Sequence, residues 1–209
     1  MSNSALVNYV KRSPHYSKRT HIIDTVTIHC AACPASVEGL GRTFSGSREC
    51  SANYGIGQDG RVGMYVDENR CSWCSSNQDN DNRAITIEVA CDRAHPYAVA
   101  PVVYAKLIDL VTDICKRNGI RELRWHNDPK LVGQVDKQNM TLHRWFAAKA
   151  CPGDWLVAHH PDIVRQVNAR LGSGKLYRVQ VGAFRNYEYA QAMLAKLKAA
   201  GYPAYIKED

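Results

Sequence analysis

Long apolar runs are missing from this 209-residue chain, and their absence excludes several classes of protein. No stretch of about 18 or more apolar residues occurs, so we expect no membrane-spanning helix and no membrane insertion. Residues 1–20, MSNSALVNYVKRSPHYSKRT, contain no continuous apolar core, so we also expect no secretory signal peptide. We therefore expect synthesis in the cytoplasm. Any target outside the cell would be reached after holin-type or other lysis, or by a non-signal route.

Signatures of nucleic-acid binding are also missing, although the chain is basic. The net charge is +7 and the sequence pI is near 9.0. The sequence has no basic helix, no aromatic RNA-binding strand and no zinc-finger spacing, and its lysines and arginines are spread along the chain. We therefore expect no nucleic-acid partner. The charge indicates either a solvated basic surface or attraction to an anionic polymer such as a cell wall.

Cysteine, in contrast, is abundant: the chain has eight, at positions 30, 33, 50, 71, 74, 91, 115 and 151. Cys30 with Cys33 and Cys71 with Cys74 have CxxC spacing, which is typical of structural zinc, a redox pair or disulfides. Synthesis in a reducing compartment argues against an obligatory disulfide framework. We favour free thiols, or a disulfide formed after release, over a second metal at these four residues. Cys91 and Cys115 lie in apolar patterns and are predicted to be buried.

Strand and helix patterns alternate along residues 1–171, which predicts an α/β domain with a mixed central sheet flanked by helices. Predicted strands cover 24–30, a hairpin turning at Gln58-Asp59-Gly60, 84–92, and ELRWH at 122–126. Predicted helices cover 35–44, the segment before Gly119, and roughly 161–171. The segment 71–83 is too polar for a core element and is predicted to be a loop.

The C-terminal segment is predicted to form a separate small unit. GSGK, residues 172–175, has the composition of a flexible linker. Residues 176–209 then show a strand pattern, a helix pattern and a second strand pattern, which predicts one βαβ unit.

Three residues have the chemistry of an open zinc site. His29 ends a predicted strand, and the stretch HRWFAAKAC places His143 and Cys151 eight positions apart. Two histidines and one cysteine would leave a fourth zinc position for water, as catalytic sites do. His126 is a rival ligand, although no lysine and cysteine accompany it. A cysteine nucleophile, Cys30 or Cys151 with a histidine, is a further alternative.

A proton carrier is also needed, and Glu88 is the candidate. It is a lone carboxylate in the strand pattern ITIEVA, where burial would raise its pKa toward the useful range. The alternative is an ordinary exposed residue on the solvent face of a half-buried strand.

Four stretches, TIHC, SANYGIGQDGRV, DNRAITIEVA and HRWFAAKACPGDW, together resemble type 2 N-acetylmuramoyl-L-alanine amidases. That family shares its fold with peptidoglycan-recognition proteins. The resemblance covers roughly residues 20–170 and is strongest to endolysins and autolysins of Gram-positive bacteria and their phages. Whether the chain is a phage lysin or a host autolysin stays open.

The resemblance implies one catalytic Zn²⁺ held by His29, His143 and Cys151, with Glu88 as the catalytic glutamate. Lys149 matches the lysine that stabilises the tetrahedral oxyanion. The implied reaction is hydrolysis of the amide between the lactyl group of N-acetylmuramic acid and L-alanine in peptidoglycan, and hence cell-wall degradation. Some relatives use a tyrosine where Ala52 stands here, so Tyr54 is expected to pack without a catalytic role. The alternative function is a non-catalytic peptidoglycan-binding protein.

Arg70, Trp73 and Asn77 precede the Glu88 strand in the polar segment. They are candidate substrate-binding residues on the wall of a groove, contacting peptide or sugar, or else simply solvated loop residues. Trp145 and Trp155 are predicted to be core residues.

The tail YRVQVGAFRNYEYAQAMLAKLKAAGYPAYIKE resembles a sporulation-related (SPOR) repeat, a family of small peptidoglycan-binding domains. It has about half the length of a whole SPOR domain. A lone βαβ unit buries little surface, so we expect it either to bind the cell wall, to pair with a second copy in a homodimer, or to pack on its own catalytic domain.

Overall fold

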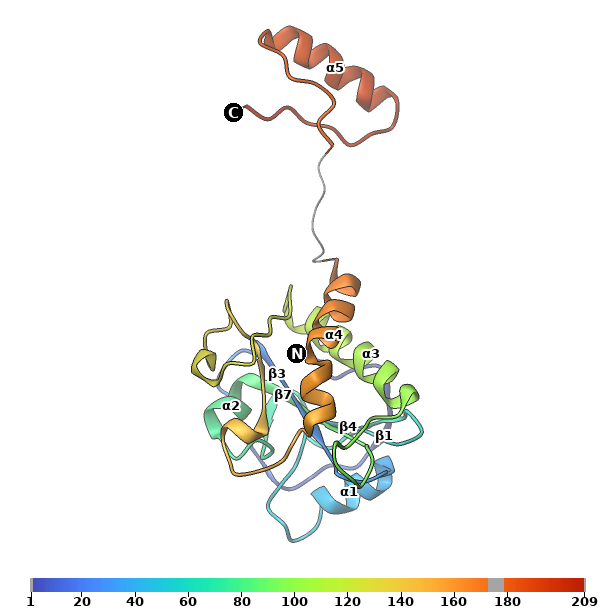
Figure 1. The fold of residues 1–209 in the computed structure, drawn as a ribbon, viewed down its shortest axis with the longest axis vertical. Coiled ribbons are helices and arrows are strands. Elements are labelled where there is room, and N and C mark those ends of the chain that lie inside the picture. The colour runs from blue at the N-terminus through green and yellow to red at the C-terminus, as the bar shows by residue number, and fades with distance from the viewer. Residues whose placement is uncertain (1, 173–178, 209) are drawn as a thin grey trace. The chain divides into compact units, whose positions relative to one another are not determined.

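The computed structural model describes residues 2–172 and 179–208 and divides the chain into two compact units, residues 1–174 and 175–209 (Figure 1). Of the predicted linker 172–175, all but Gly172 lies outside the described residues. No helix of the described chain is long and apolar enough to cross a membrane.

The N-terminal unit is built on a mixed six-stranded sheet, as its alternating patterns predict. The strand order is β1 (Val7–Val10), β5 (Val62–Met64), β4 (Tyr54–Ile56), β7 (Ala84–Val89), β3 (Thr25–Cys30) and β8 (Met140–Thr141). Strands β4, β7, β3 and β8 run parallel, and the predicted hairpin joins β4 to β5 antiparallel. A second, two-stranded sheet pairs β2 (Tyr16–Lys18) with β6 (Arg70–Ser72).

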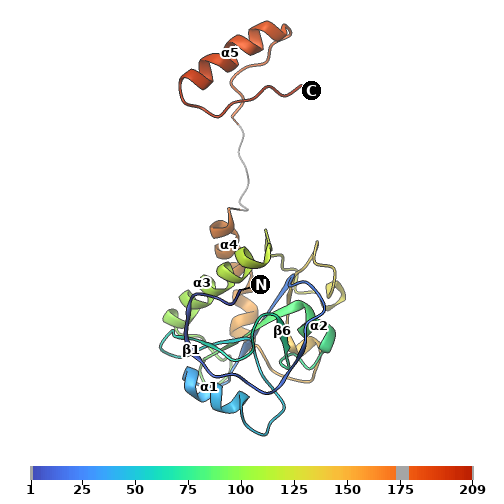
Figure 2. The same ribbon diagram turned by 180° about the vertical axis from the view of Figure 1, so that it is seen from behind.

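Helices cover both faces of the main sheet (Figure 2). They are α1 (Val37–Phe44), α2 (Gln78–Arg83), α3 (Pro101–Asn118) and α4 (Asp154–Leu171), with short 3-10 turns η1 (Pro129–Leu131) and η2 (His143–Trp145). Helices α3 and α4 pack side by side, and α3 also packs on β4 and β7. As predicted, α3 ends at Gly119, which has a left-handed φ of 73°.

Side-chain alternation on the central strands separates the core from the other face of the sheet. Ile28 and Ile87 are fully buried in the cluster that contains the apolar residues of α3. Because successive strand residues point to opposite faces, His29 and Glu88 face away from α3. The chemistry-bearing residues therefore share the sheet face opposite the main core.

A glycine beside Glu88 lets α1 pack closely on that face. Gly55 on β4 is the register partner of Glu88. A Cβ atom at Gly55 would lie 2.7 Å from Leu40 Cδ1 and 2.9 Å from a carbon of the Tyr65 ring. Both neighbours are buried, so a larger residue would force α1 away from the sheet.

The strand predicted at residues 122–126 is wrong. Its backbone N–H groups bond to side-chain amides instead of to a neighbouring strand: Leu123 N donates to Asn168 Oδ1, Arg124 N to Asn139 Oδ1 and His126 N to Gln138 Oε1. Those acceptors satisfy the buried donors, so the segment is extended without joining a sheet.

Two further boundaries differ from the sequence-based expectation. The last helix begins at Asp154 rather than near 161, because Leu156 and His160 bury one side of its first two turns, and Pro161 lies inside it. The segment 71–83 is not only loop: it contributes to β6 and forms α2, in which Asn80 and Asp81 are buried. Asp81 accepts bonds from the backbone N–H groups of Cys74 and Ser75, which supplies polar partners for a polar sequence.

Burial of His160 predicts an acid-sensitive fold. His160 is fully buried, and burial lowers its pKa from 6.5 to about 4 although it bonds the Leu156 carbonyl. Between these values the unfolded chain binds a proton that the folded chain does not, so stability falls as pH drops through this range. The unfolding free energy should fall by about 2–3 kcal/mol between pH 7 and pH 4.5 through this group. In denaturant titrations, His160→Leu should lose less stability over that interval than the wild type. Equal losses would contradict the assignment.

The C-terminal unit contains helix α5 (Tyr187–Ala199), as predicted, but neither predicted strand is formed within residues 179–208. The start of the first predicted strand, at 177–178, lies outside the described residues. The unit as described is therefore not a βαβ unit. The reason is that a single pair of strands buries too little surface to be stable by itself. Helix α5 adds little burial, because none of its residues is buried.

Candidate active site

Three neighbouring parallel strands end with the same short pattern, which places three functional residues together. Strand β3 contains Thr27-Ile28-His29 and β7 contains Thr86-Ile87-Glu88, each directly before the last residue of the strand, and β8 continues as Thr141-Leu142-His143. The register pairs His29 with Glu88 and Thr27 with Thr141. In parallel sheets, ligands bind outside the carboxyl ends of the strands, and this edge is such a position.

His29, His143 and Cys151 form a compact group at this edge. One nitrogen from each histidine and the Cys151 sulfur lie within 4.8 Å of one another. Cys151 Sγ is 3.4 Å from His29 Nδ1, and the two imidazole rings are 5.1 Å apart in an edge-on arrangement. Ligand atoms around a tetrahedral zinc lie roughly 3.5 Å apart, so the three residues fit that ion.

The state of His29 also fits a metal ligand. The side chain is buried, and Nε2 has no hydrogen-bond partner among the described residues. Burial, helped by the neighbouring His143, lowers the pKa of His29 to about 3, so the ring is neutral and a nitrogen lone pair is free. The pKa of His143 is likewise lowered by its burial and by the charge of Lys149.

The chain between η2 and α4 brings Cys151 back to His143. Arg144 N donates to the Cys151 carbonyl, and the Arg144 guanidinium bonds the Ala150 carbonyl and Asp154. Gly153 then starts α4 with a φ of 85°, where a Cβ would lie 3.0 Å from Tyr97. These bonds hold the turn so that Cys151 faces the two histidines.

Glu88 lies beside this group. A Glu88 carboxylate oxygen, the Cys74 sulfur and a His29 nitrogen lie within 4.8 Å of one another. Burial, with a smaller contribution from the nearby Cys91, raises the pKa of Glu88 to about 8, while Arg48 opposes the shift. A carboxyl group with this pKa can both hold and release a proton near neutral pH.

The family of this chain follows from its sequence match. Residues 18–154 match the N-acetylmuramoyl-L-alanine amidase family. This chain belongs to that family. Residues 173–209 match the SPOR domain. No curated protein matches the chain.

Several solved structures share the fold. A mutant endolysin from Bacillus subtilis is 14% identical with a TM-score of 0.58, and the match covers 77% of this chain and 99% of that one. An AmpD derivative is 19% identical with a TM-score of 0.55, covering 78% and 96%. PlyL is 15% identical with a TM-score of 0.53, covering 75% and 88%. At these identities the likeness shows the fold, and it confirms the predicted mixed α/β architecture.

Lys149 of the amidase is exposed on the turn that precedes Cys151. Its charge acts on His143, which places the ammonium group within electrostatic range of the histidine and cysteine group. No hydrogen bond or ion pair of the Lys149 side chain is found within the described residues.

The three candidate substrate residues of the amidase each have a structural partner. The Arg70 guanidinium lies 4.2 Å above the Tyr16 ring, and Trp73 Nε1 donates to Ser17 Oγ. The Asn77 side chain caps α2 by accepting from Asn80 N. None of them belongs to the histidine and cysteine group, and their contact with substrate stays a prediction.

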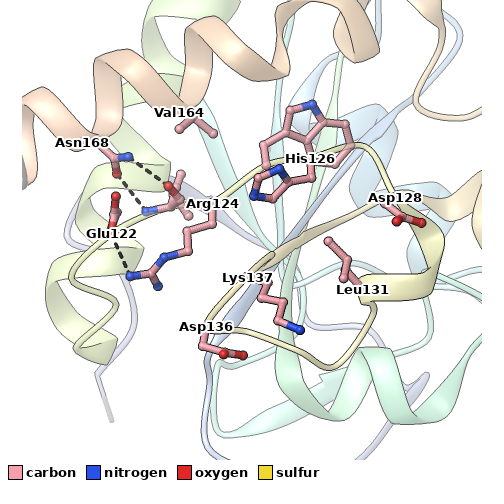
Figure 3. Close-up of a pocket in the computed structure, with 11 residues that line it drawn as sticks. Glu122, Arg124, His126, Asp128, Leu131, Asp136, Lys137, Val164 and Asn168 are labelled. Carbon is pink, nitrogen blue, oxygen red and sulfur yellow. Dashed lines mark hydrogen bonds and ion pairs between the residues drawn. The ribbon is translucent and has the colours of Figure 1, made fainter.

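The rival ligand His126 lies elsewhere in the amidase. It lines a surface pocket of about 710 Å³ together with Glu122, Arg124, Asp128 and Lys137 (Figure 3). It has no place in the groups of potential metal ligands found within the described residues. The pairs Cys30 with Cys33 and Cys71 with Cys74 do not form a four-cysteine group there either, and all eight thiols are free. Trp145 and Trp125 stack at 5.6 Å, and both are half-buried.

Sequence reasoning did not place three residues beside the site. Ser76 Oγ is 3.1 Å from His143 Nε2, Asn80 bonds both Thr27 and Thr141, and Cys74 lies against Glu88. All three belong to the polar segment 71–83. A usable signal was a tripeptide that occurs three times: threonine, an aliphatic residue, and then histidine or glutamate. It marks the strand ends beside which the segment 71–83 lies.

Proposed function

We propose that the protein is a zinc-dependent N-acetylmuramoyl-L-alanine amidase that cleaves the bond between N-acetylmuramic acid and L-alanine in peptidoglycan. The observation that carries this proposal is the group formed by His29, His143 and Cys151 beside the half-buried Glu88. Membership of the amidase family supports the same reaction.

The residues have separate roles in this proposal. His29 and His143 provide neutral nitrogens and Cys151 a thiolate. A zinc ion bound there would supply Lewis acidity toward a carbonyl oxygen and toward water. Glu88 accepts the proton of the attacking water and returns it to the departing alanine nitrogen. Lys149 offers a positive charge to the developing oxyanion, a contribution of about 3 kcal/mol in comparable sites.

Digestion of purified peptidoglycan, followed by mass spectrometry, tests the function. The expected products are stem peptides with a free N-terminal alanine and glycan strands without peptide. Intact peptidoglycan that nevertheless retains the protein in a pull-down would make the chain a non-catalytic binding protein. Cleavage at another bond would contradict the assigned specificity.

The biological setting that fits this activity is cell-wall degradation by a lysin or autolysin. A protein of this kind would be made in the cytoplasm and act on the wall after release. Substrate contacts by Arg70, Trp73 and Asn77 belong to the same proposal, because these residues lie directly before or within the segment 71–83 that also supplies Ser76 and Cys74.

We further propose that the C-terminal units of two chains pair. Within residues 179–208, α5 buries none of its residues, and Val181, Phe184 and Tyr205 are exposed. Segments 180–187 and 204–208 line a 500 Å³ pocket with the apolar side of α5, a surface that a second copy would cover.

Sedimentation equilibrium of the full-length protein tests this pairing. The wild type should be dimeric, and Val181→Glu should shift it to a monomer without affecting cleavage by the catalytic unit. A wild-type monomer at high concentration would contradict the proposal.

A further inference from the structure

A closed ring of side-chain hydrogen bonds lies directly under the two histidines. Asn80 Nδ2 donates to Thr27 Oγ1 at 3.1 Å, and Thr141 Oγ1 donates to Asn80 Oδ1 at 2.9 Å. The two threonine hydroxyl oxygens are 2.7 Å apart. All three residues are buried.

With the Asn80 amide oriented as it is, the hydrogens of this ring run in one sense. Thr141 uses its hydroxyl hydrogen on Asn80, so Thr27 must donate the bond between the two hydroxyls. The ring then runs from Asn80 Nδ2 through Thr27 and Thr141 back to Asn80 Oδ1, with each donor used once. An aspartate at position 80 would have no hydrogen for Thr27 and would bury a charge.

The ring is the last link between β3 and β8 before the proposed metal ligands His29 and His143. Strand β8 has only two residues, paired as Val26 with Met140 and Thr27 with Thr141. After that the chain enters η2, so no strand pairing holds His143 to β3. Thr27 and Thr141 lie roughly 6.5 Å before the histidines along their strands and point to the same face.

We propose that Asn80 is a positioning residue that sets the spacing of His29 and His143 by locking Thr27 to Thr141. This rests on the proposed zinc function. Asn80 itself is held by the Asn77 cap of α2, and the same segment contacts His143 through Ser76. Outer-shell partners of metal ligands typically change metal affinity by about 10–100-fold when they are removed.

The experiment measures zinc affinity by chelator competition and the thiolate charge-transfer band of the cobalt-loaded protein, with full-length protein. Asn80→Ala, Thr27→Val and Thr141→Val should each lower zinc affinity by about 10–100-fold and shift the cobalt spectrum. Thr27→Ser and Thr141→Ser keep the hydroxyls and should restore affinity to nearly the wild-type value.

Thr86→Val is the matched control. Thr86 is equally buried, bonds Asn53 and Ser72, and lies under Glu88 instead of under a histidine. It should leave zinc affinity and the cobalt spectrum unchanged, even where it lowers the unfolding midpoint in urea. If Asn80 had only a general packing role, zinc affinity would fall in proportion to the urea unfolding midpoint in every variant, including Thr86→Val. That result would overturn the proposal.

Two outcomes separate this inference from the function it rests on. Wild-type protein that binds zinc but cleaves no peptidoglycan would overturn the proposed function, while the affinities of the variants would still decide the role of Asn80. Wild-type zinc affinity in a folded Asn80→Ala variant would overturn the positioning role and leave the amidase function intact.

Discussion

Glu88→Gln is expected to lower the rate of peptide release from peptidoglycan by roughly two to four orders of magnitude. Glutamine has the same shape as glutamate but cannot accept the proton of the attacking water. Position 88 is held by strand β7, whose register with His29 does not depend on the side chain. The loss should therefore appear in catalysis without a loss of stability. The measurement is kcat/KM for the release of peptides with a free N-terminal alanine.

The control for this substitution is Glu49→Gln, the same chemical change at an exposed position outside the site. Zinc content of both variants should match the wild type within error. In urea unfolding near neutral pH, Glu49→Gln should match the wild type and Glu88→Gln should be at least as stable, because glutamine removes a carboxyl group whose charge is disfavoured by burial. A Glu88→Gln variant that keeps more than about a tenth of wild-type activity would remove Glu88 from the role of proton carrier, since such groups contribute far more.

Cys151→Ala is expected to abolish activity by removing a metal ligand. Loss of an outer-shell partner costs about 10–100-fold in affinity, so loss of a direct ligand should cost more than about 100-fold. Zinc content after dialysis is the first readout, and activity in the presence of a chelator is the second. Cys33→Ala, which removes a half-buried thiol outside the group, should keep both zinc and activity.

The same substitution separates a metal ligand from a nucleophile. If Cys151 attacked the substrate, Cys151→Ala would be inactive yet retain zinc, and the wild type would resist chelators. Cys151→Asp sharpens the distinction, because a carboxylate also binds zinc. We expect Cys151→Asp to recover part of the zinc affinity and part of the activity, which an aspartate replacing a thiol nucleophile would not do.

Much of this site was predictable because it lies at the ends of strongly patterned strands. The apolar alternation around His29 and Glu88 placed both residues on strands, and the short spacing of His143 and Cys151 marked a turn. Parallel strands then bring their ends to one edge. The positions of all four residues follow from local patterns combined with one rule of sheet geometry.

The errors arose where distant side chains replace local structure. Residues 122–126 look like a strand, but their N–H groups bond to amides at positions 138, 139 and 168, which no local window includes. Asn80 is part of a polar run that looks like loop, and its role depends on two threonines 53 and 61 positions away. In the tail, the pattern predicts strands for which the described unit offers no partner.

The place of β8 in the sheet has a consequence for the order of events during synthesis. Strands β1, β5, β4, β7 and β3 are all complete by residue 89, whereas β8 adds to one edge of the sheet only at residues 140–141. His29 and Glu88 are thus made early, and His143 and Cys151 leave the ribosome more than fifty residues later. A chain that ends before residue 143 contains only one of the three proposed ligands. Under the proposed function, a chain still being translated would lack two of the three zinc ligands, and with them the ability to hydrolyse peptidoglycan, until the catalytic unit is almost complete.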